Sequence, residues 1–273
     1  MRSRFLPLLV AGFGTLALGI VLVLVFQAAT GDAWAGFPLS KAGLTDEYCE
    51  RNHFEDFIRQ PMNAWSNLCY FFLGLWMMTA GLQDARSKRR DNPLQAFPGM
   101  SLWMGLTMVG LCFGSFFFHA SLTRLGQHWD MGFTYALSLS LVAMGGYRAM
   151  ALRLGDRSLG LKVAWLTAAV VAAVLMFAFK WLIDGKVALP ILMLLGLWFV
   201  IGLWWRLRGR LNGWLILAGI LALVLSIVCR GLDLAKIGCD PDGWLQWHAF
   251  WHLFTGLSAF CFWRVLWGER ESP

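Results

Sequence analysis

Long apolar runs almost free of charge are the feature that most constrains how this chain folds. The stretch from Phe5 to Gly31 contains no charged residue, and further apolar runs follow along the 273-residue chain. A helix needs roughly 20 consecutive apolar residues to cross the hydrocarbon core of a bilayer. Charged residues make up only 14% of the chain, whereas soluble domains carry about a quarter. The sequence therefore predicts an all-α, polytopic transmembrane bundle.

Seven later runs are long enough to form core helices, and the N-terminal run adds an extra hydrophobic helix. The seven are Pro61 to Leu82, Met100 to His119, Trp129 to Tyr147, Val163 to Ile183, Val187 to Trp205, Trp214 to Val228 and Trp244 to Trp263. No internal repeat or long linker divides them. We expect residues 46–268 to form one seven-helix membrane domain.

Residues 1–35 read as either a signal-anchor helix or a cleaved signal peptide, because Arg2 and Arg4 precede the apolar run. The triplet Ala33-Trp34-Ala35 resembles a cleavage site. The apolar stretch is nevertheless longer than the about 7 to 15 residues of a signal-peptide core. This length favours a retained helix.

Basic residues are concentrated in alternate loops, which predicts the orientation of the bundle. By the positive-inside rule these loops are cytoplasmic. The loops around Gln127, Asp184 and Asp240 are then extracytoplasmic, and the C-terminus is cytoplasmic. The net charge of +7 is explained by these loops, so we do not expect nucleic acid as a partner. The basic residues are Arg86, Lys88, Arg89, Arg90, Arg148, Arg153, Arg157, Lys162, Arg206, Arg208 and Arg210.

Cys49 and Cys239 differ from the other four cysteines, which lie in or at the ends of apolar runs. Both fall in predicted extracytoplasmic segments, where an oxidising environment permits a disulfide. A bridge between them would join the segment before the first core helix to the loop before the last one.

Three histidines sit where they could bind one metal ion. His248 and His252 are four residues apart, which places them on one face of a helix. A structural pair that hydrogen-bonds to a neighbouring helix would show the same spacing. His119 ends a helix that runs outward, whereas the pair begins a helix that runs inward, so all three reach the same leaflet. Three protein ligands with a fourth position left for water are typical of catalytic zinc.

The base for such a site must come from elsewhere, because Ala249 follows His248 and no Glu accompanies the pair. Asp130 is the candidate base, since it lies at the start of the next inward-running helix, on the same side of the membrane as the three histidines. A helix cap or an interfacial acid is the alternative. Ser115 lies four residues before His119 and could stabilise an oxyanion, although serines in membrane helices often bond to their own helix.

An acidic segment before the first core helix contains Asp46, Glu47, Glu50, Asn52, Glu55 and Asp56. Packed oxygen ligands of this kind could hold Ca²⁺, although a solvated acidic face is the default interpretation. Arg230 and Asp233, three apart, form either an ordinary ion pair or a support for a zinc-binding histidine.

Several of these motifs, taken in order, resemble the alkaline ceramidase family. They are Glu47-Tyr48-Cys49-Glu50-Arg51-Asn52, Pro61-Met62-Asn63-Ala64-Trp65-Ser66-Asn67, Gly114-Ser115-Phe116-Phe117-Phe118-His119, Asp130, Asp233 with Cys239, and His248-Ala249-Phe250-Trp251-His252 with Thr255-Gly256. The resemblance spans roughly Glu47 to Gly256. It implies seven helices, a membrane-embedded site and hydrolysis of the ceramide amide to a sphingoid base and a fatty acid, with no obligate protein partner evident.

The same resemblance implies a set of site residues. Zn²⁺ is expected on His119, His248 and His252, and catalytic roles on Ser115 and Asp130. Ca²⁺ is expected near Glu47, the Tyr48 carbonyl, Glu50, Asn52 and Gln60, and a disulfide between Cys49 and Cys239. Two positions depart from the family pattern. Glu47 stands where the family has Asp, and Gln60 lies near its calcium-binding Glu but is a weaker, neutral ligand.

Related proteins leave alternatives open for the function. The wider superfamily includes adiponectin-receptor-like proteins and lipid-remodelling hydrolases with the same Ser, Asp and three-His core. A heptahelical receptor with a structural zinc is therefore one alternative. A hydrolase of another lipid amide or ester is a second. A metal transporter would need ionisable groups throughout the membrane depth, and here they cluster near one face.

Overall fold

The structure is a computed structural model that describes residues 5–28, 33–87, 92–155 and 159–270. Its long helices are α1 (Leu6–Ala28), α4 (Leu68–Arg86), α6 (Gly99–Ser121), α7 (Arg124–Leu154), α8 (Leu159–Ala178), α9 (Gly185–Arg206), α10 (Gly213–Leu234) and α11 (Trp247–Trp267). The short helices are α2 (Lys41–Leu44), α3 (Pro61–Trp65), α5 (Pro93–Ala96) and η1 (Lys180–Leu182). No strand occurs among these residues beyond one isolated bridge between Leu39 and Thr123. The predicted all-α membrane bundle is confirmed.

Five of the long helices are apolar and long enough by themselves to cross a membrane: α1, α6, α8, α9 and α10. The chain is therefore an integral membrane protein. Helices α4, α7 and α11 are of comparable length but more polar. The last two carry Asp130, His248 and His252, which explains their lower apolar content. The total of seven spanning core helices stays a prediction.

Several helix boundaries differ from those predicted. The first core run is divided into α3 and α4, because the Asn67 side chain donates hydrogen bonds to the carbonyls of Asn63 and Ala64. Helix α11 begins at Trp247 rather than Trp244, since Gln246 anchors the preceding loop to the carbonyls of Asp240 and Gly243. Helix α7 extends beyond both ends of its apolar run, because polar residues at helix ends interrupt an apolar pattern without ending a helix.

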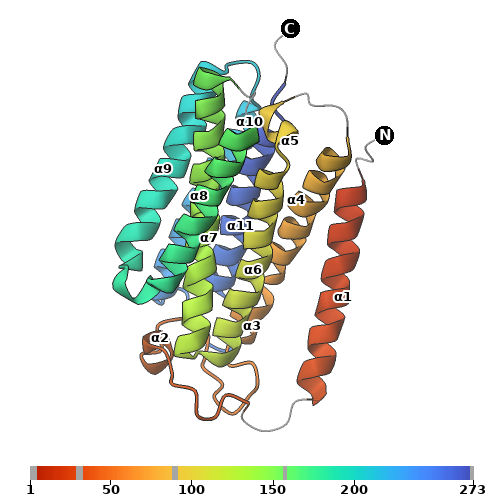
Figure 1. Cartoon of the computed structure of the whole chain (residues 1–273). Helices are drawn as coiled ribbons and strands as arrows, with labels where there is room; N and C mark the ends of the chain where they lie inside the picture. The colour runs from red at the N-terminus through yellow and green to blue at the C-terminus, as the bar shows by residue number, and fades with distance from the viewer. Residues whose placement is uncertain (1–4, 29–32, 88–91, 156–158, 271–273) are drawn as a thin grey trace.

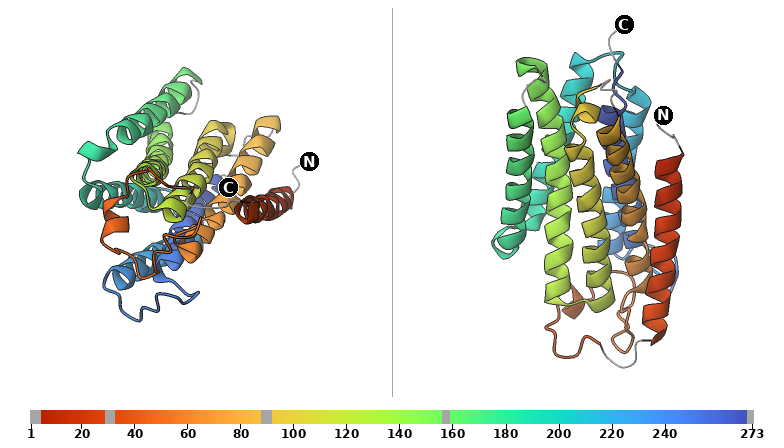
Figure 2. Two further views of the ribbon diagram at one scale, coloured as in Figure 1. Left: turned by 90° about the horizontal axis from the view of Figure 1, so that it is seen from below. Right: turned by 45° about the vertical axis from the view of Figure 1, so that its right-hand side comes forward.

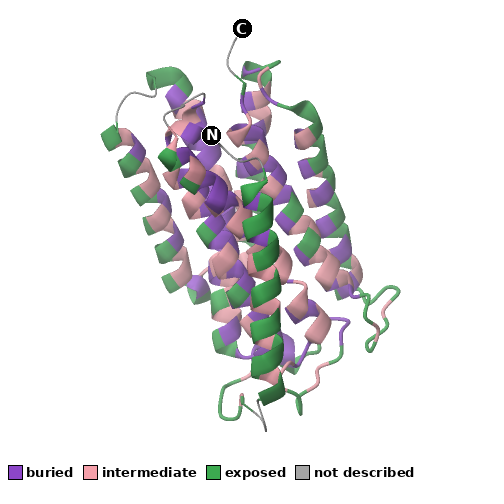
Figure 3. Cartoon of the chain, turned by 90° about the vertical axis from the view of Figure 1, so that its right-hand side faces the viewer, coloured by how far each residue is buried: buried purple, intermediate pink, exposed green. Residues whose placement is uncertain are grey.

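Helices α6 and α11 lie inside the bundle, with α6 packed on α4 and α7, and α11 packed on α10 and α4 (Figure 1). Helix α1 packs on α4 at one edge, and α8 and α9 cover α7 at the opposite edge (Figure 2). The core includes Met77, Met104, Met108 and Trp263, all buried. Apolar side chains are exposed along much of α1 (Figure 3), as expected for a helix facing lipid.

The two ends of the bundle are different. Helices α2 and α3 and the start of α11 lie at one end, and α11 finishes at the other (Figure 1). The basic residues of the predicted cytoplasmic loops follow or end α4, α7 and α9 or begin α8, so they gather at this second end. Lys88, Arg89, Arg90 and Arg157 lie outside the described residues.

The link from α6 to α7 brings two functional segments together. Helix α6 ends at Leu122, whose left-handed backbone (φ of 52°) reverses the chain, and the Thr123 side chain caps α7 by accepting a hydrogen bond from the Gly126 N–H. Further into the bundle from this turn, α6 and α7 approach each other closely at Gly114. A Cβ there would lie 2.9 Å from the Trp129 carbonyl oxygen and 3.2 Å from the Asp130 nitrogen. Glycine at this position therefore permits Ser115 and Asp130 to lie side by side.

Candidate metal centre

His119, His248 and His252 converge on one point in the half of the bundle nearer α2 and α3. One ring nitrogen of each lies within 4.8 Å of the others. The ring centroids are 4.9 Å apart for His119 and His248, 5.2 Å for His119 and His252, and 4.6 Å for His248 and His252. All three side chains are buried. Within the described residues this is the one group of three or more His, Cys, Asp or Glu side chains arranged to hold a metal ion.

Each histidine is oriented by a partner on its Nδ1 side. Gln60 Oε1 lies 2.7 Å from His119 Nδ1, and Ser66 Oγ lies 2.8 Å from His252 Nδ1. Ser66 donates its only hydrogen to the Asn63 carbonyl at 2.8 Å, so its oxygen accepts from His252. The Gln60 carbonyl oxygen is also an acceptor. Both imidazoles are therefore assigned as protonated on Nδ1, with the Nε2 lone pair left for a metal ion.

Asp233 supports the third histidine. One of its oxygens lies 3.4 Å from His248 Nδ1 and accepts a 2.9 Å hydrogen bond from Arg230. The Arg230 guanidinium is itself 3.3 Å from the same ring nitrogen. The other carboxylate oxygen accepts from the Cys49 N–H at 3.0 Å. The two alternatives left open by the sequence therefore coexist, because Asp233 is both paired with Arg230 and adjacent to His248.

The Cys49–Cys239 disulfide is present, as predicted. It joins the segment before α3 to the loop before α11, and the Arg51 N–H strengthens this join by donating to the Pro241 carbonyl at 3.0 Å. These two connections keep the ligands on α6 and α11 in a fixed position relative to one another at this end of the bundle.

Two tyrosine rings enclose the cluster. Tyr48 lies edge-on to His248 with centroids 4.5 Å apart and to His119 with centroids 5.2 Å apart. Tyr70 packs on His252 and is hydrogen-bonded to Thr255. These rings pack against the imidazoles and restrict how far they can turn. The Tyr48 ring therefore contributes to the site independently of any role for its carbonyl.

Ser115 and Asp130 lie beside one another next to the cluster, on facing parts of α6 and α7. The Ser115 hydroxyl interacts with the Asp130 carboxyl group but completes no hydrogen bond of good geometry, although Ser115 is only 1% exposed. Asp130 also lies within electrostatic range of the phenols of Tyr48 and Tyr70, whose rings pack on the histidines. A buried hydroxyl with spare hydrogen-bonding capacity is what a site awaiting a ligand would show.

The side chains among the predicted calcium ligands are engaged with protein groups. Glu47 accepts from Arg230 at 2.7 Å, and Asn52 Oδ1 accepts from Gln60 Nε2 at 2.7 Å. The Glu50 carboxylate accepts from the N–H groups of Met62 and Asn63 at 2.6 and 2.8 Å and so caps the start of α3. Burial raises the pKa of Glu50 to about 7 in spite of these hydrogen bonds.

The two remaining histidines lie outside the cluster. His53 is 3.9 Å from the exposed Asp56 carboxylate, and His128 packs on Phe177 and Trp181. Neither belongs to the group of converging ligands.

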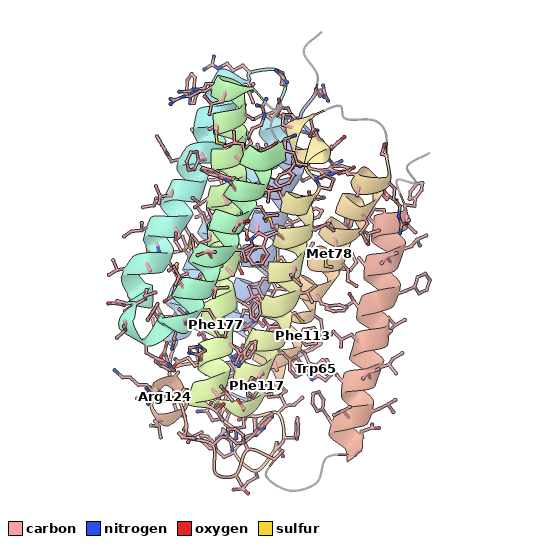
Figure 4. All side chains as sticks on the ribbon, in the orientation of Figure 1. Trp65, Met78, Phe113, Phe117, Arg124 and Phe177 are labelled. Atoms are coloured by element: carbon pink, nitrogen blue, oxygen red, sulfur yellow. A yellow bond between two sulfur atoms is a disulfide. The ribbon has the colours of Figure 1, made fainter. Side chains whose placement is uncertain are left out.

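An apolar groove of about 450 Å³ runs along the outside of α6 and α7. Gly114 and Trp129 line it, and they are the sequence neighbours of Ser115 and Asp130. Its other walls are Gly110, Phe113, Phe117 and Phe133. Figure 4 labels Phe113 and Phe117 on the half of the bundle that contains α3. A larger cavity of about 640 Å³ lies between α7, α8 and α9 and is lined by Arg153 and Arg206 near the opposite end, away from the histidines.

Two roles at the site were missed by reasoning from the sequence: Ser66 as the partner of His252, and Gln60 as the partner of His119. Ser66 had a detectable signal. Asn63, Ser66 and Asn67 are polar residues spaced by three and four at the start of an apolar run, which indicates a polar helix face turned towards other polar groups.

A family model described as Ceramidase matches residues 44–268 of the chain. This range covers every ligand and partner described above and omits α1. A comparison with curated proteins finds no match.

Proposed function

Because this chain belongs to the ceramidase family of lipid amide hydrolases, we propose that it is a zinc-dependent intramembrane enzyme that cleaves the amide bond of ceramide or a related N-acyl lipid. The products would be a free fatty acid and a sphingoid-type amine. The observation that carries the proposal is the buried set of three converging imidazoles beside the Ser115 hydroxyl and the Asp130 carboxyl group.

The donor set fits zinc. His119, His248 and His252 would hold the ion through their Nε2 atoms, because their Nδ1 atoms are turned towards Gln60, Asp233 and Ser66. Three neutral imidazoles leave a fourth position open, as in catalytic zinc sites. When bound, zinc would supply Lewis acidity that lowers the pKa of a water molecule from about 15.7 towards about 7.

Asp130 is assigned the proton transfers of the reaction. Its carboxylate takes a proton from the attacking water as the new C–O bond forms at the amide carbonyl. It returns that proton to the amide nitrogen as the C–N bond breaks, which releases the amine and leaves a carboxylic acid. Ser115, beside Asp130, donates its hydroxyl hydrogen to the oxygen that becomes negatively charged.

The groove along α6 and α7 is assigned to an apolar chain of the lipid. It is lined by aromatic rings and glycines, opens on the outside of the bundle, and adjoins the residues next to Ser115 and Asp130. A lipid could thus present its amide to the site without leaving the bilayer.

The orientation is also part of the proposal. The basic residues gather at the end opposite the histidines, which supports a site near the extracytoplasmic side and a C-terminus in the cytoplasm. The Cys49–Cys239 disulfide supports the same orientation, because it faces the site end of the bundle.

The experiment is a hydrolysis screen with the purified full-length chain. Ceramides, other N-acyl lipids and lipid esters are tested with and without removal of bound metal, and released fatty acid is measured by mass spectrometry. We expect amide hydrolysis that stops on metal removal and returns with Zn²⁺. Asp130→Asn should lower turnover by roughly 10² to 10⁴-fold while zinc content stays unchanged.

Asp184→Asn is the matched control, because the Asp184 side chain caps the start of α9 and is not among the converging metal-binding residues. Equal turnover in the Asp130→Asn variant and the control would contradict the assignment of the base. A receptor with a structural zinc would bind the metal and release no fatty acid from any lipid in the screen.

A further inference from the structure

Arg230 brings a permanent positive charge into the segment where the family resemblance leads one to expect calcium. Its guanidinium donates to Glu47 at 2.7 Å and to Asp233 at 2.9 Å, and it lies 4.9 Å from the centre of the Tyr48 ring. Only 23% of the side chain is exposed. An arginine does not lose its proton in a protein. A divalent cation bound by Glu47 would therefore lie next to a fixed like charge.

Both polar atoms of the Gln60 side-chain amide form hydrogen bonds within the protein. Its oxygen accepts from His119 Nδ1 at 2.7 Å, and its nitrogen donates to Asn52 Oδ1 at 2.7 Å. Its backbone N–H donates to the His119 carbonyl at 3.0 Å. Gln60 is 1% exposed. The one oxygen that Gln60 could offer to a cation is thus used to orient a histidine, and its nitrogen repels a cation from Asn52.

The side-chain oxygens of Asn52 and Glu50 are occupied as well. Asn52 donates its own amide hydrogens to Asp46 Oδ1 at 2.6 Å and to the Gly43 carbonyl at 3.3 Å, which fixes which of its atoms is the oxygen. Both Glu50 oxygens accept backbone N–H groups at the start of α3. Calcium requires six to eight oxygen ligands. The four side chains expected to supply them are satisfied by hydrogen bonds and by one guanidinium.

We propose that this chain holds no calcium beside its histidine cluster, and that Arg230 and Gln60 take the structural role that a calcium ion would have there. Arg230 neutralises Glu47 and Asp233 and so holds the segment before α3 against α10. Gln60 connects that segment to His119. Gln60 and Arg230 are positioning residues for the histidine cluster, since both act through other side chains.

The first experiment uses the wild-type chain and reads calcium binding directly. Protein is equilibrated in buffer passed over a calcium-depleting resin, with its zinc content monitored, and titrated with CaCl₂ to roughly 10 mM, above the about 10⁻⁴ to 10⁻³ M dissociation constants of weak extracellular calcium modules. We expect no saturable binding heat and no shift of the melting temperature. Saturable binding below about 1 mM, or a melting temperature that rises with calcium, overturns the proposal. Neither readout depends on hydrolysis, so the experiment tests the calcium proposal separately from the proposed function.

The second experiment tests whether changing Gln60 and Arg230 allows the segment to bind calcium. The double variant Gln60→Glu/Arg230→Gln gains a carboxylate and loses the guanidinium, and it should bind calcium at least tenfold more tightly than wild type and melt at a calcium-dependent temperature. Gln127→Glu/Arg124→Gln makes the same charge changes at the same end of the bundle, outside this network, and should bind no calcium. A folded double variant that binds calcium no better than this control contradicts the roles assigned to Gln60 and Arg230. If the double variant is too unstable, the single variant Gln60→Glu and the wild-type titration decide the matter.

Discussion

The Cys49 backbone N–H donates a 3.0 Å hydrogen bond to the Asp233 carboxylate, which lies 184 residues further along the chain. The other oxygen of that carboxylate is 3.4 Å from His248 Nδ1. Cys49 is also disulfide-bonded to Cys239, which precedes the helix that carries His248. One short segment thus fixes both the carboxylate and the helix that place the histidine, so the metal centre depends on a region that supplies no ligand.

Removing the charge of Asp233 should weaken metal binding. In Asp233→Asn the amide no longer helps to neutralise Arg230, which lies 3.3 Å from His248 Nδ1 and then keeps only Glu47 as a counter-charge. Loss of such an outer partner costs roughly 10- to 100-fold in metal affinity. Competition with a chromophoric chelator measures the change. Asp242→Asn, which removes an exposed acid paired with Arg51, should leave zinc affinity as it was. A similar loss in both variants would show that the effect is one of net charge only.

Opening the disulfide should reduce both stability and metal retention. Cys49→Ser/Cys239→Ser releases a closed loop of 190 residues. Removal of a native disulfide typically costs about 2 to 5 kcal/mol. Because Cys49 also orients Asp233, zinc should dissociate faster from this variant. Thermal unfolding and zinc release are measured alongside Cys229→Ser, which changes a free cysteine of α10. Unaltered zinc release in the double serine variant would separate the disulfide from the metal centre.

The pKa of Glu50 gives the stability of the fold a defined pH dependence. Burial raises this pKa to about 7, above the value of about 4.3 for a carboxyl group in an unfolded chain. The folded protein therefore binds more protons than the unfolded one between these values, so the contribution of Glu50 is present below about pH 4.5 and is lost as the pH rises to about 7. The loss amounts to about 4 kcal/mol. It should appear as a falling melting temperature from pH 5 to pH 7.5.

Two variants test this origin. Glu50→Gln does not titrate and should flatten the slope, whereas the exposed Glu55→Gln should preserve it. A slope that is the same in Glu50→Gln and in wild type would assign the pH dependence to another group.

Arg148 and Glu269 form a buried ion pair at the end of the bundle opposite the histidines. Two hydrogen bonds of 2.6 Å join them, and Arg210 approaches the same carboxylate at 2.7 Å. Breaking a buried pair by removing one partner costs about 3 to 5 kcal/mol. Because Arg210 remains, we expect Arg148→Met to lose about 3 kcal/mol of stability and to keep its zinc affinity. Arg153→Met, at an exposed position on the same helix, is the control. Weaker zinc binding in Arg148→Met would show that the two ends are coupled.

The candidate site was predictable from the sequence where local spacing decides the outcome. His248 and His252 share a helix face because four residues complete about one turn, and Ser115 and His119 do so for the same reason. His119 and Asp130 reach the same end of the bundle because the membrane forces successive helices to alternate in direction. Cys49 and Cys239 fall on one side by the same alternation. These relationships survive any reasonable packing of the helices.

The partners of the histidines were not predictable in this way. Gln60 and His119 are 59 residues apart, and Ser66 and His252 are 186 apart. Asn67 ends the short helix α3 by bonding back to it, and this break turns Gln60 and Ser66 towards α6 and α11.

Apolar runs, loop charges and helical spacing thus determined by themselves that the chain is a membrane bundle with three histidines and an acid at one end. Only the tertiary structure decided which nitrogen of each histidine ring is left for a metal ion, and that an arginine and a glutamine occupy the expected calcium segment. The physical reason is that a membrane fixes the depth and direction of each helix from composition alone. Hydrogen bonds act over about 3 Å, so they depend on how the helices and the segments between them pack.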